Sequence, residues 1–312
     1  MKTYRSKLNR FKNLDRFSTH QVKALFGFHP AILADILFRV LPELERRRAT
    51  RLANRSDRKR SYLDNDGRPR EVTPLHKVLM TMIYLRHNVS HTVVGALFDF
   101  SADVSEDAFA EVLPLLRDLF PKEKWAAEKR HRGTESKWNP EQVDCLIIDS
   151  FETPVGRPSL NDRQKRTYSG KKKQHTIKSQ VVTDGAGEVL DIDAGSCGPK
   201  SDIKLYEESK LKQKLPAALR DKPVLGDKAY ADQKHPEITT PTKKPKGGEL
   251  TPAQKQRNKE ISKRRVRVEH GIRRVKGFRI LRDQYRMARG IFPTVASAVV
   301  GLIHFSHCLA GG

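Results

Sequence analysis

The sequence predicts a mixed α and β protein, with helices in its N-terminal half and a β-sheet flanked by helices in its C-terminal half. Apolar residues recur at helical spacing over residues 73–120, and strand patterns begin only at Val143. The stretch between them, residues 121–142, is polar and charged, as linkers are. We therefore expect four parts: a helical and basic N-terminal segment (1–72), a helical domain (73–120), a linker (121–142) and a sheet domain (143–309).

The N-terminal segment combines one helical pattern with one basic run. Residues 31–45 show the apolar spacing of an amphipathic helix. The run RRRATRLANRSDRKR follows at residues 46–60, and Asp57 is its one acidic residue. Such a run is either a solvated linker or a contact to a DNA backbone, and the sequence leaves both possibilities open.

Three helices are predicted in the next domain. Thr73 can cap a helix that has Pro74 in its first turn, and a turn flanked by Ser101 and Ser105 precedes the last helix. The helices are expected at residues 73–86, 90–101 and 106–120. A tight turn between the last two of three helices is typical of a helix-turn-helix.

The last of these helices begins with acidic residues, namely Asp103, Glu106 and Asp107. Base edges in the major groove are usually read by Arg, Lys, Asn or Gln near the start of such a helix. We therefore do not expect this helix alone to read a DNA sequence.

The sheet domain has its elements in a recognisable order. VDCLIIDS (143–150) reads as a buried strand, and HTIKSQVVTD and GEVLDIDAG read as a hairpin joined at Asp184 to Gly187. A helix, a further strand and two more helices are expected at residues 201–212, 223–227, 251–276 and 291–309. Three antiparallel strands, a crossover helix and another strand are the order of the ribonuclease H-like fold. We expect that fold here, with a mixed five-stranded sheet flanked by helices.

The composition indicates a polyanionic partner. The chain has 61 Lys and Arg against 37 Asp and Glu, which gives a net charge of +24 and a pI of about 10.1. Such a charge draws nucleic acid, although a ribosomal-type basic protein would show it too. The N-terminus lacks the apolar stretch of a signal peptide, and the longest apolar run, near residues 291–305, is interrupted by Pro293 and His304. We expect a soluble, intracellular protein that is not associated with a membrane.

Two sets of residues that often have functions are expected to have none here. Cys145, Cys197 and Cys308 are odd in number and widely spaced, so we expect reduced thiols and neither zinc ligands nor disulfides. Trp125 and Trp138 flank the linker. Either residue could stack on a flipped base, but anchoring the linker to a domain is commoner.

Three carboxylates carry the strongest prediction of chemistry. Asp149 stands at the end of the strand VDCLIIDS, Asp227 ends VLGD, and Glu269 lies in the very basic stretch ISKRRVRVEHGIRRVK. Carboxylates that converge from separate segments repel one another unless divalent cations neutralise them. The cluster therefore predicts two-metal phosphoryl transfer.

Glu269 is conspicuous because its surroundings are so basic. Residues 251–289 contain fourteen Lys and Arg and three Asp and Glu, a local charge of 14 − 3 = +11. On a helix, Arg265, Glu269, Ile272 and Lys276 share one face. That face could hold a metal ligand between two phosphate-binding cations, but an ordinary ion pair on a solvated helix would need no active site.

The motifs together resemble a known family. Asp149 opens the string DSFETPVGRP, a second string reads YSGKKKQHTIK from Tyr168 to Lys178, and Asp227 lies within GDKAY. The helix expected at residues 251–276 carries a further motif, with Asn258, Arg265, Glu269 and Lys276 at fixed offsets. Over about residues 75–307 the chain resembles the DDE transposases of bacterial insertion sequences and their Harbinger-type relatives, whose ribonuclease H-like catalytic domain follows a helix-turn-helix.

The resemblance implies a DNA transposase that binds two Mg²⁺ ions through Asp149, Asp227 and Glu269, with Mn²⁺ as a substitute. Asp149 would bridge both ions, held about 3.5 to 4 Å apart, with one of the other acids on each. Water would free a 3′ hydroxyl at the element's end, and that hydroxyl would then attack target DNA. The implied partner is double-stranded DNA, both terminal inverted repeats and target, bound by a homodimer. The resemblance also implies a bacterial protein of the cytoplasm that is associated with the nucleoid.

Several cations are candidates for holding the DNA backbone at this site: Lys171, Lys172, Lys173, Lys178, Arg265 and Lys276. The four lysines could instead belong to a basic surface loop. Glu152 and Asp202 are also near the expected cleft in sequence, and we interpret both as structural.

The chain departs from the family pattern at two positions. Ser201 and Asp202 stand where many relatives have His-Asp, and Ser262 stands where some have Tyr. Two rival functions follow from the same features. One is a domesticated, non-catalytic DNA-binding protein or regulator, although the three acids are intact. The other is a ribonuclease or resolvase of the same fold, which would need no terminal repeats.

Overall fold

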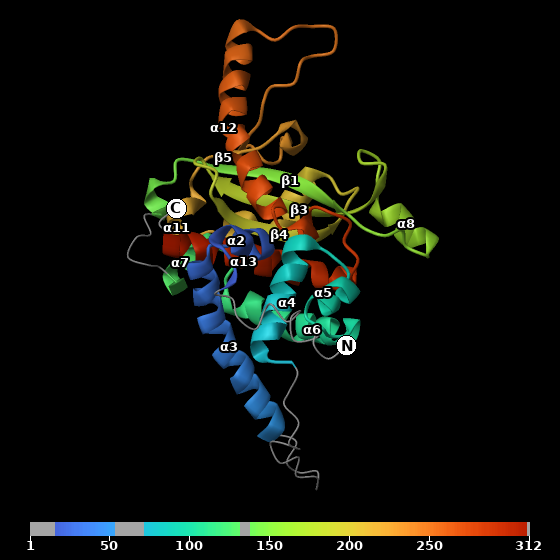
Figure 1. The fold of residues 1–312 in the computed structure, drawn as a ribbon. Coiled ribbons are helices and arrows are strands. Elements are labelled where there is room, and N and C mark those ends of the chain that lie inside the picture. Colours follow the sequence, from blue (N-terminus) through green and yellow to red (C-terminus); the bar gives the residue numbers. More distant parts are fainter. Residues whose placement is uncertain (1–15, 54–71, 132–137, 311–312) are drawn as a thin grey trace, which may run out of the picture. The chain divides into compact units, whose positions relative to one another are not determined.

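The computed structural model describes residues 16–53, 72–131 and 138–310 of the chain (Figure 1). These residues divide into two units, Met1–Leu119 and Phe120–Gly312. Each unit is described by itself below. The first unit is helical and the second contains the sheet, as the sequence predicts.

The first unit is built from helices that pack on one another around α4. Their bounds are Thr19–Phe26 (α2), Pro30–Ala53 (α3), Pro74–His87 (α4), His91–Leu97 (α5) and Ala102–Leu119 (α6). Side-chain caps fix the starts of α2, α4 and α5, because Ser18 accepts from Gln21 N–H, Thr73 from His76 N–H and Ser90 from Val93 N–H. The cap at Thr73 and Pro74 confirms the predicted start of α4.

α3 is longer than the predicted helix and takes in half of the basic run. It continues to Ala53, so the first part of residues 46–60 is helical, while residues 54–60 lie outside the described residues. Arg47 bonds both Glu43 and Asp118, and Arg51 pairs with Glu111 of α6. These ion pairs tie the run to α6, so its helical part is not a solvated linker.

α5 and α6 follow the predicted order, but α6 begins four residues earlier than expected. Ser101 accepts a hydrogen bond from Val104 N–H (3.4 Å) and so acts as the cap, which places Ser105 inside the first turn of the helix, where it is buried. The residues between α5 and α6 pass very close to Gly95. A Cβ at that position would lie 2.5 Å from the carbonyl oxygen of Ser101, so only glycine fits.

The sheet of the second unit has six strands among the described residues. Five follow the order β2-β3-β1-β5-β6, and β4 pairs with the side of β3 that faces away from β1. β1 is antiparallel to β3 and parallel to β5. The bounds are Leu146–Pro154 (β1), Tyr168–Ser169 (β2), Gln174–Asp184 (β3), Val189–Cys197 (β4), Val224–Leu225 (β5) and Ile238–Thr239 (β6). The prediction of five strands was wrong by one, because a two-residue strand leaves no periodicity in the sequence.

β1 extends beyond the strand predicted at residues 143–150. It pairs with β3 as far as Pro154 opposite Thr176, whereas its pairing with β5 ends at Ile147. Asp149 therefore lies within β1 and not after it, two residues beyond Ile147, the last residue of β1 that pairs with β5. The extension was missed because its alternating buried residues, Phe151 and Thr153, form a short pattern.

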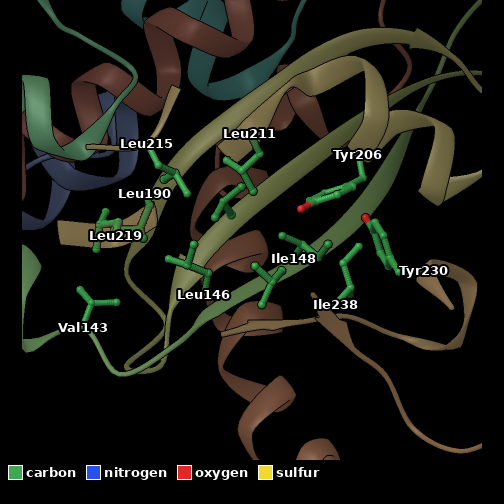
Figure 2. Close-up of a cluster of buried hydrophobic side chains, with 12 residues drawn as sticks. Val143, Leu146, Ile148, Leu190, Tyr206, Leu211, Leu215, Leu219, Tyr230 and Ile238 are labelled. Carbon is green, nitrogen blue, oxygen red and sulfur yellow. The ribbon is translucent and has the colours of Figure 1, made fainter. Parts of the chain in front are cut away.

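Helices cover both faces of this sheet. One face packs on Asp202–Ser209 (α9), Leu211–Lys214 (α10) and Ala217–Arg220 (α11). Figure 2 shows the core between them, where Leu146 and Ile148 of β1 meet Tyr206, Leu211 and Tyr230. On the other face, Val268 and Ile272 of Pro252–Lys276 (α12) pack on Cys145 and Ile147.

The C-terminal helix Phe292–Ala310 (α13) belongs to this core. It packs against β4, α12 and Lys124–His131 (α7). Within the described residues, Arg289–Leu309 is long and apolar enough to cross a membrane, and α2 with α3 would qualify only as a pair bent by 55°. Most of α13 is buried inside the unit, as in the core helix of a folded domain.

The segment expected to be a linker, residues 121–142, contains α7. Ala127 is fully buried, and Phe120 and His131 place their rings 4.9 and 5.0 Å from that of Phe305 in α13. Its polar composition hid this helix because Lys124 and Glu128 are buried as an ion pair of 2.8 Å. Trp125 and Trp138 pack against the sheet core, which is the anchoring that the sequence favoured. The three cysteines are free.

Candidate active site

Asp149 occupies the central strand and faces α12. Its neighbour Ile147 points to the same side and packs on that helix. One carboxylate oxygen accepts from Ser150 N–H (2.8 Å) and the other lies 3.4 Å from a guanidinium nitrogen of Arg265. Burial raises the pKa of Asp149, and the charges of Asp227 and Asp202 raise it further, against the effects of Ser150 N–H and Arg265.

Asp227 follows β5, the parallel neighbour of β1. β5 ends at Leu225, and Asp227 then caps the 3₁₀ turn Lys228–Tyr230 (η4) by accepting from Ala229 N–H at 2.7 Å. Because parallel strands end at the same edge of a sheet, Asp227 lies on the same edge as Asp149. Their charges influence each other, so the structure brings these two predicted acids together.

α12 carries three further residues that the sequence predicts for the site, namely Arg265, Glu269 and Lys276. Arg265 and Lys276 both interact with the charge of Asp149, and the Lys276 ammonium lies 5.0 Å from the ring centre of Phe151. Burial lowers the pKa of Lys276, and the nearby charge of Lys172 lowers it further. Glu269 lies between Arg265 and Lys276 on one helical stripe, with its side chain exposed.

No three His, Cys, Asp or Glu side chains lie close enough together to hold a metal ion as they stand in the part of the chain that the structure describes. Glu269 is the member of the predicted set that is not gathered with the others. Its side chain is exposed, and its role as a ligand stays a prediction.

Asp202, which the sequence placed near the expected cleft as a structural residue, forms a second polar centre beside Asp149. It stands at the start of α9 and accepts from the Ser150 hydroxyl (2.6 Å) and the Lys178 ammonium (2.7 Å). Lys178 also donates to the carbonyl of Lys200 (2.8 Å) and is 8% exposed. Its ammonium therefore points inward, and its predicted contact with DNA stays a prediction.

Tyr230 links these two centres. Its hydroxyl is fully buried and has no hydrogen-bond partner among the described residues. Burial raises the pKa of Tyr230 well above 10, and the charges of Asp202, Asp149 and Asp227 add to that effect, which Arg265 opposes. Tyr230 is the last residue of the motif GDKAY, so its signal stands in the sequence beside that of Asp227.

The remaining predicted lysines form an exposed turn between β2 and β3. Lys172 N–H donates to the Ser169 hydroxyl (3.2 Å), and Lys173 adopts a positive φ of 56°. Lys171, Lys172 and Lys173 are all exposed, and Lys172 is close enough to Lys276 for their charges to interact. The turn thus borders the same site. Glu152 accepts from the Thr176 hydroxyl (2.6 Å), a structural contact.

Comparisons with known proteins agree with the motifs. A family model described as DDE superfamily endonuclease matches residues 148–304, and one described as helix-turn-helix of DDE superfamily endonuclease matches residues 70–122. The second match confirms the helix-turn-helix predicted for α4 to α6. The first range includes the three predicted acids.

Two curated relatives are transposases by name. The chain is 33% identical over 173 residues to the probable transposase for insertion sequence element IS702 of Microchaete diplosiphon, a match that covers 54% of this chain and 60% of that protein. It is 25% identical over 219 residues to the putative transposase for insertion sequence element IS112 of Streptomyces albus G, covering 70% and 74%. The chain thus spans less than two thirds of the first relative.

A solved structure also resembles the chain. The piggyBac transposase in a synaptic complex with hairpin DNA gives a TM-score of 0.38 at 11% identity, covering 92% of this chain and 74% of that one.

Proposed function

The chain belongs to the DDE superfamily of endonucleases, and from this membership we propose that it is a DNA transposase that cuts and joins the ends of an insertion sequence. The observation that carries the proposal is the position of Asp149, on the central strand beside Asp227 and opposite Arg265 and Lys276 of α12. A carboxylate pair bordered by cations suits a phosphodiester substrate.

A ribonuclease H-like fold for the second unit is part of the proposal. It is supported by the strand sequence β4-β3-β1-β5-β6, in which the first three strands are antiparallel and the last three parallel, with helices on both faces. In such a sheet the edge after β1 and β5 is where ligands bind. Asp149 and Asp227 lie at that edge.

We propose Asp149, Asp227 and Glu269 as ligands of two divalent cations. The residues fit such a group, because burial and the charge of Asp227 both disfavour the ionised form of Asp149, and a cation would relieve this. All the donors are oxygens, which favours Mg²⁺, with Mn²⁺ as a substitute. When bound, such ions lower the pKa of an attacking water and neutralise charge at the leaving oxygen.

The chain's own cations have a separate task. The Nη2 atom of Arg265 lies 3.4 Å from Oδ2 of Asp149, which is a long contact. Its Nε is buried without a partner among the described residues. This guanidinium can turn its free donors to a phosphate oxygen. Lys276 and Lys172 border the same place, and their mutual repulsion would be relieved by a phosphate between them.

The proposed reaction has two steps at this one site. Water first attacks the phosphodiester at the element's end and releases a 3′ hydroxyl. That hydroxyl then attacks a phosphodiester of target DNA, and the target's own 3′ oxygen leaves. Two ends must be brought together, so we expect a homodimer on DNA, acting in the bacterial cytoplasm.

The test is cleavage of a supercoiled plasmid that carries the element's own ends, in Mg²⁺ or in EDTA. Glu269→Gln should abolish cleavage, because it removes the charge of one proposed ligand and little else. Glu260→Gln is the matched control, since Glu260 is an exposed acid on the same helix. Tight binding by the wild type without cleavage in either Mg²⁺ or Mn²⁺ would refute the proposal in favour of a non-catalytic DNA-binding protein.

A further inference from the structure

The N-terminal part of α12 stands clear of the sheet (Figure 1). Ile261 is the first buried residue of this helix, so Pro252–Glu260 packs on no core. The loop before the helix runs back to it and is fastened there by Asn258, whose amide accepts from Thr242 N–H (2.8 Å) and donates to the Thr242 carbonyl (3.0 Å). These two bonds hold Pro252–Glu260, which we call the projection, in place although this segment buries almost nothing.

α12 displays a row of like charges that begins on this projection and continues past it. Lys255, Lys259, Lys263 and Arg267 follow at intervals of four residues and are all exposed; we call them the cation ladder. Residues four apart are neighbours on a helix, and like charges there destabilise it. Within the described part of the chain, the ion pair made by the ladder is Lys255 with Glu249 (3.2 Å), between two largely exposed side chains. The row therefore opposes helix stability in the free protein.

A polyanion suits this surface better than a protein does. Residues 243–267 contain ten Lys and Arg against two Glu, and residues 240–267 contain no aromatic residue. Protein interfaces have an apolar core in which aromatic residues are enriched, and charged residues are depleted there. A DNA backbone needs only cations at regular spacing.

We propose that the cation ladder binds the phosphate backbone of DNA that extends away from the cleavage point. The inference rests on the proposed function, since Arg265 of the same helix faces Asp149. From Arg265 back to Pro252 is 265 − 252 = 13 residues, or about 20 Å at about 1.5 Å per residue. That length corresponds to about six base pairs of duplex at about 3.4 Å each.

The experiment measures how the affinity of the full chain for a mixed-sequence duplex depends on salt, with EDTA present. In the variant Lys255→Gln/Lys259→Gln/Lys263→Gln, the slope of log affinity against log salt should fall by about 2.7, at about 0.9 for each of three lost phosphate contacts. The Lys→Arg triple should keep the wild-type slope. The Gln triple should melt no lower than the wild type, because it removes repulsion.

The matched control is Lys129→Gln/Lys204→Gln/Lys214→Gln, which removes three exposed lysines from α7, α9 and α10 of the same unit. A slope that the ladder variant leaves unchanged both with this duplex and with one carrying the element's terminal repeat would overturn the proposal, and so would an equal fall in this control.

Two sources of DNA share this backbone, the element's end and the target. A second duplex that carries the element's terminal repeat separates them. A fall confined to the repeat assigns the ladder to the element's end, and a fall with both duplexes assigns it to DNA of any sequence, target included. Both results support the ladder as a DNA contact. Because no cleavage is needed, a wild type that never cuts DNA would refute the proposed function without changing this result.

Discussion

Asp149 is an acid whose charged form the folded protein disfavours. Burial raises its pKa, and so do the charges of Asp227 and Asp202. Because the raised pKa makes the folded state bind the proton more tightly than the unfolded chain, the ionised group lowers stability at neutral pH. This effect is lost as the pH falls through the raised pKa toward the ordinary value of 3.8.

Asp149→Asn should therefore abolish Mg²⁺-dependent cleavage and at the same time raise the melting temperature at neutral pH. The difference in melting temperature should shrink as the pH is lowered toward 4. Thermal melts across this range, with the exposed Asp162→Asn as control, measure it. A difference that is the same at every pH would mean that packing and not charge is responsible.

Lys178 and Asp202 form a largely buried ion pair, so removing one partner leaves the other charge buried and unpaired. Their side chains are only 10% and 14% exposed. Lys178→Met leaves the carboxylate without its cation and should lower the free energy of unfolding by about 3 kcal/mol. Adding Asp202→Asn should restore most of that loss, since the Ser150 hydroxyl can still donate to the new amide. Urea unfolding of both variants tests this, and equal losses would exclude the pair as the cause.

The sequence singled out Asp149 and Asp227 because each stands at the end of an oily run. It also placed Asp202 near the expected cleft, as a structural residue, but it did not single out Tyr230, which η4 brings there through packing on the sheet. Glu269 was chosen for its basic surroundings, and its helix face is as predicted, while its role as a ligand stays a prediction.

α12 reaches Asp149 because Gly271 lets it approach the sheet. A Cβ at this position would lie 2.8 Å from Cγ2 of Thr183 and 3.2 Å from the carbonyl oxygen of Gly187. Long elements such as this helix and β3 were predictable from periodicity and caps. The two-residue strands β2 and β6, the start of α6 at Ala102 and the helix α7 were not, because short or buried polar segments leave no clear period.

Gly271→Ala should destabilise the protein and weaken cleavage, because the helix must move away from the sheet and carry Arg265 with it. Overpacking costs about 1–3 kcal/mol and alanine returns up to about 1 kcal/mol of helix propensity, so a net loss of about 1–2 kcal/mol is expected. Gly290→Ala is the control, since nothing lies within 4 Å of a Cβ there. Unchanged stability in Gly271→Ala would show that α12 does not need this close approach.

At the scale of the whole molecule, the boundary between the two units lies between Leu119 and Phe120. Phe120 and α7 belong to the second unit, although the sequence placed that unit's start at residue 143. Lys122 donates to Asp191 (2.7 Å) and to the carbonyl of Ile192 (2.6 Å) in β4, which adds to the attachment. The boundary was not readable from composition, because the residues that hold it are charged.

A fragment of residues 120–312 should therefore fold by itself, whereas one of residues 143–312 should not. The shorter fragment lacks α7 and leaves the surface of α13 uncovered. Cooperative thermal unfolding followed by circular dichroism distinguishes them. A shorter fragment that unfolds as cooperatively as the longer one would restore the boundary at residue 143.

α13 follows all the other helices and strands along the described chain, so a gene copy that is truncated early encodes a protein without it. The helix supplies core to β4 and α7 after every acid of the site has already been translated. A ribosome that stops before residue 292 would release a chain with Asp149, Asp227 and Glu269 intact but with its sheet unsupported. Gene copies with an early stop codon would then encode the three acids without the activity, so a genomic survey that counts only those acids would overestimate the number of functional elements.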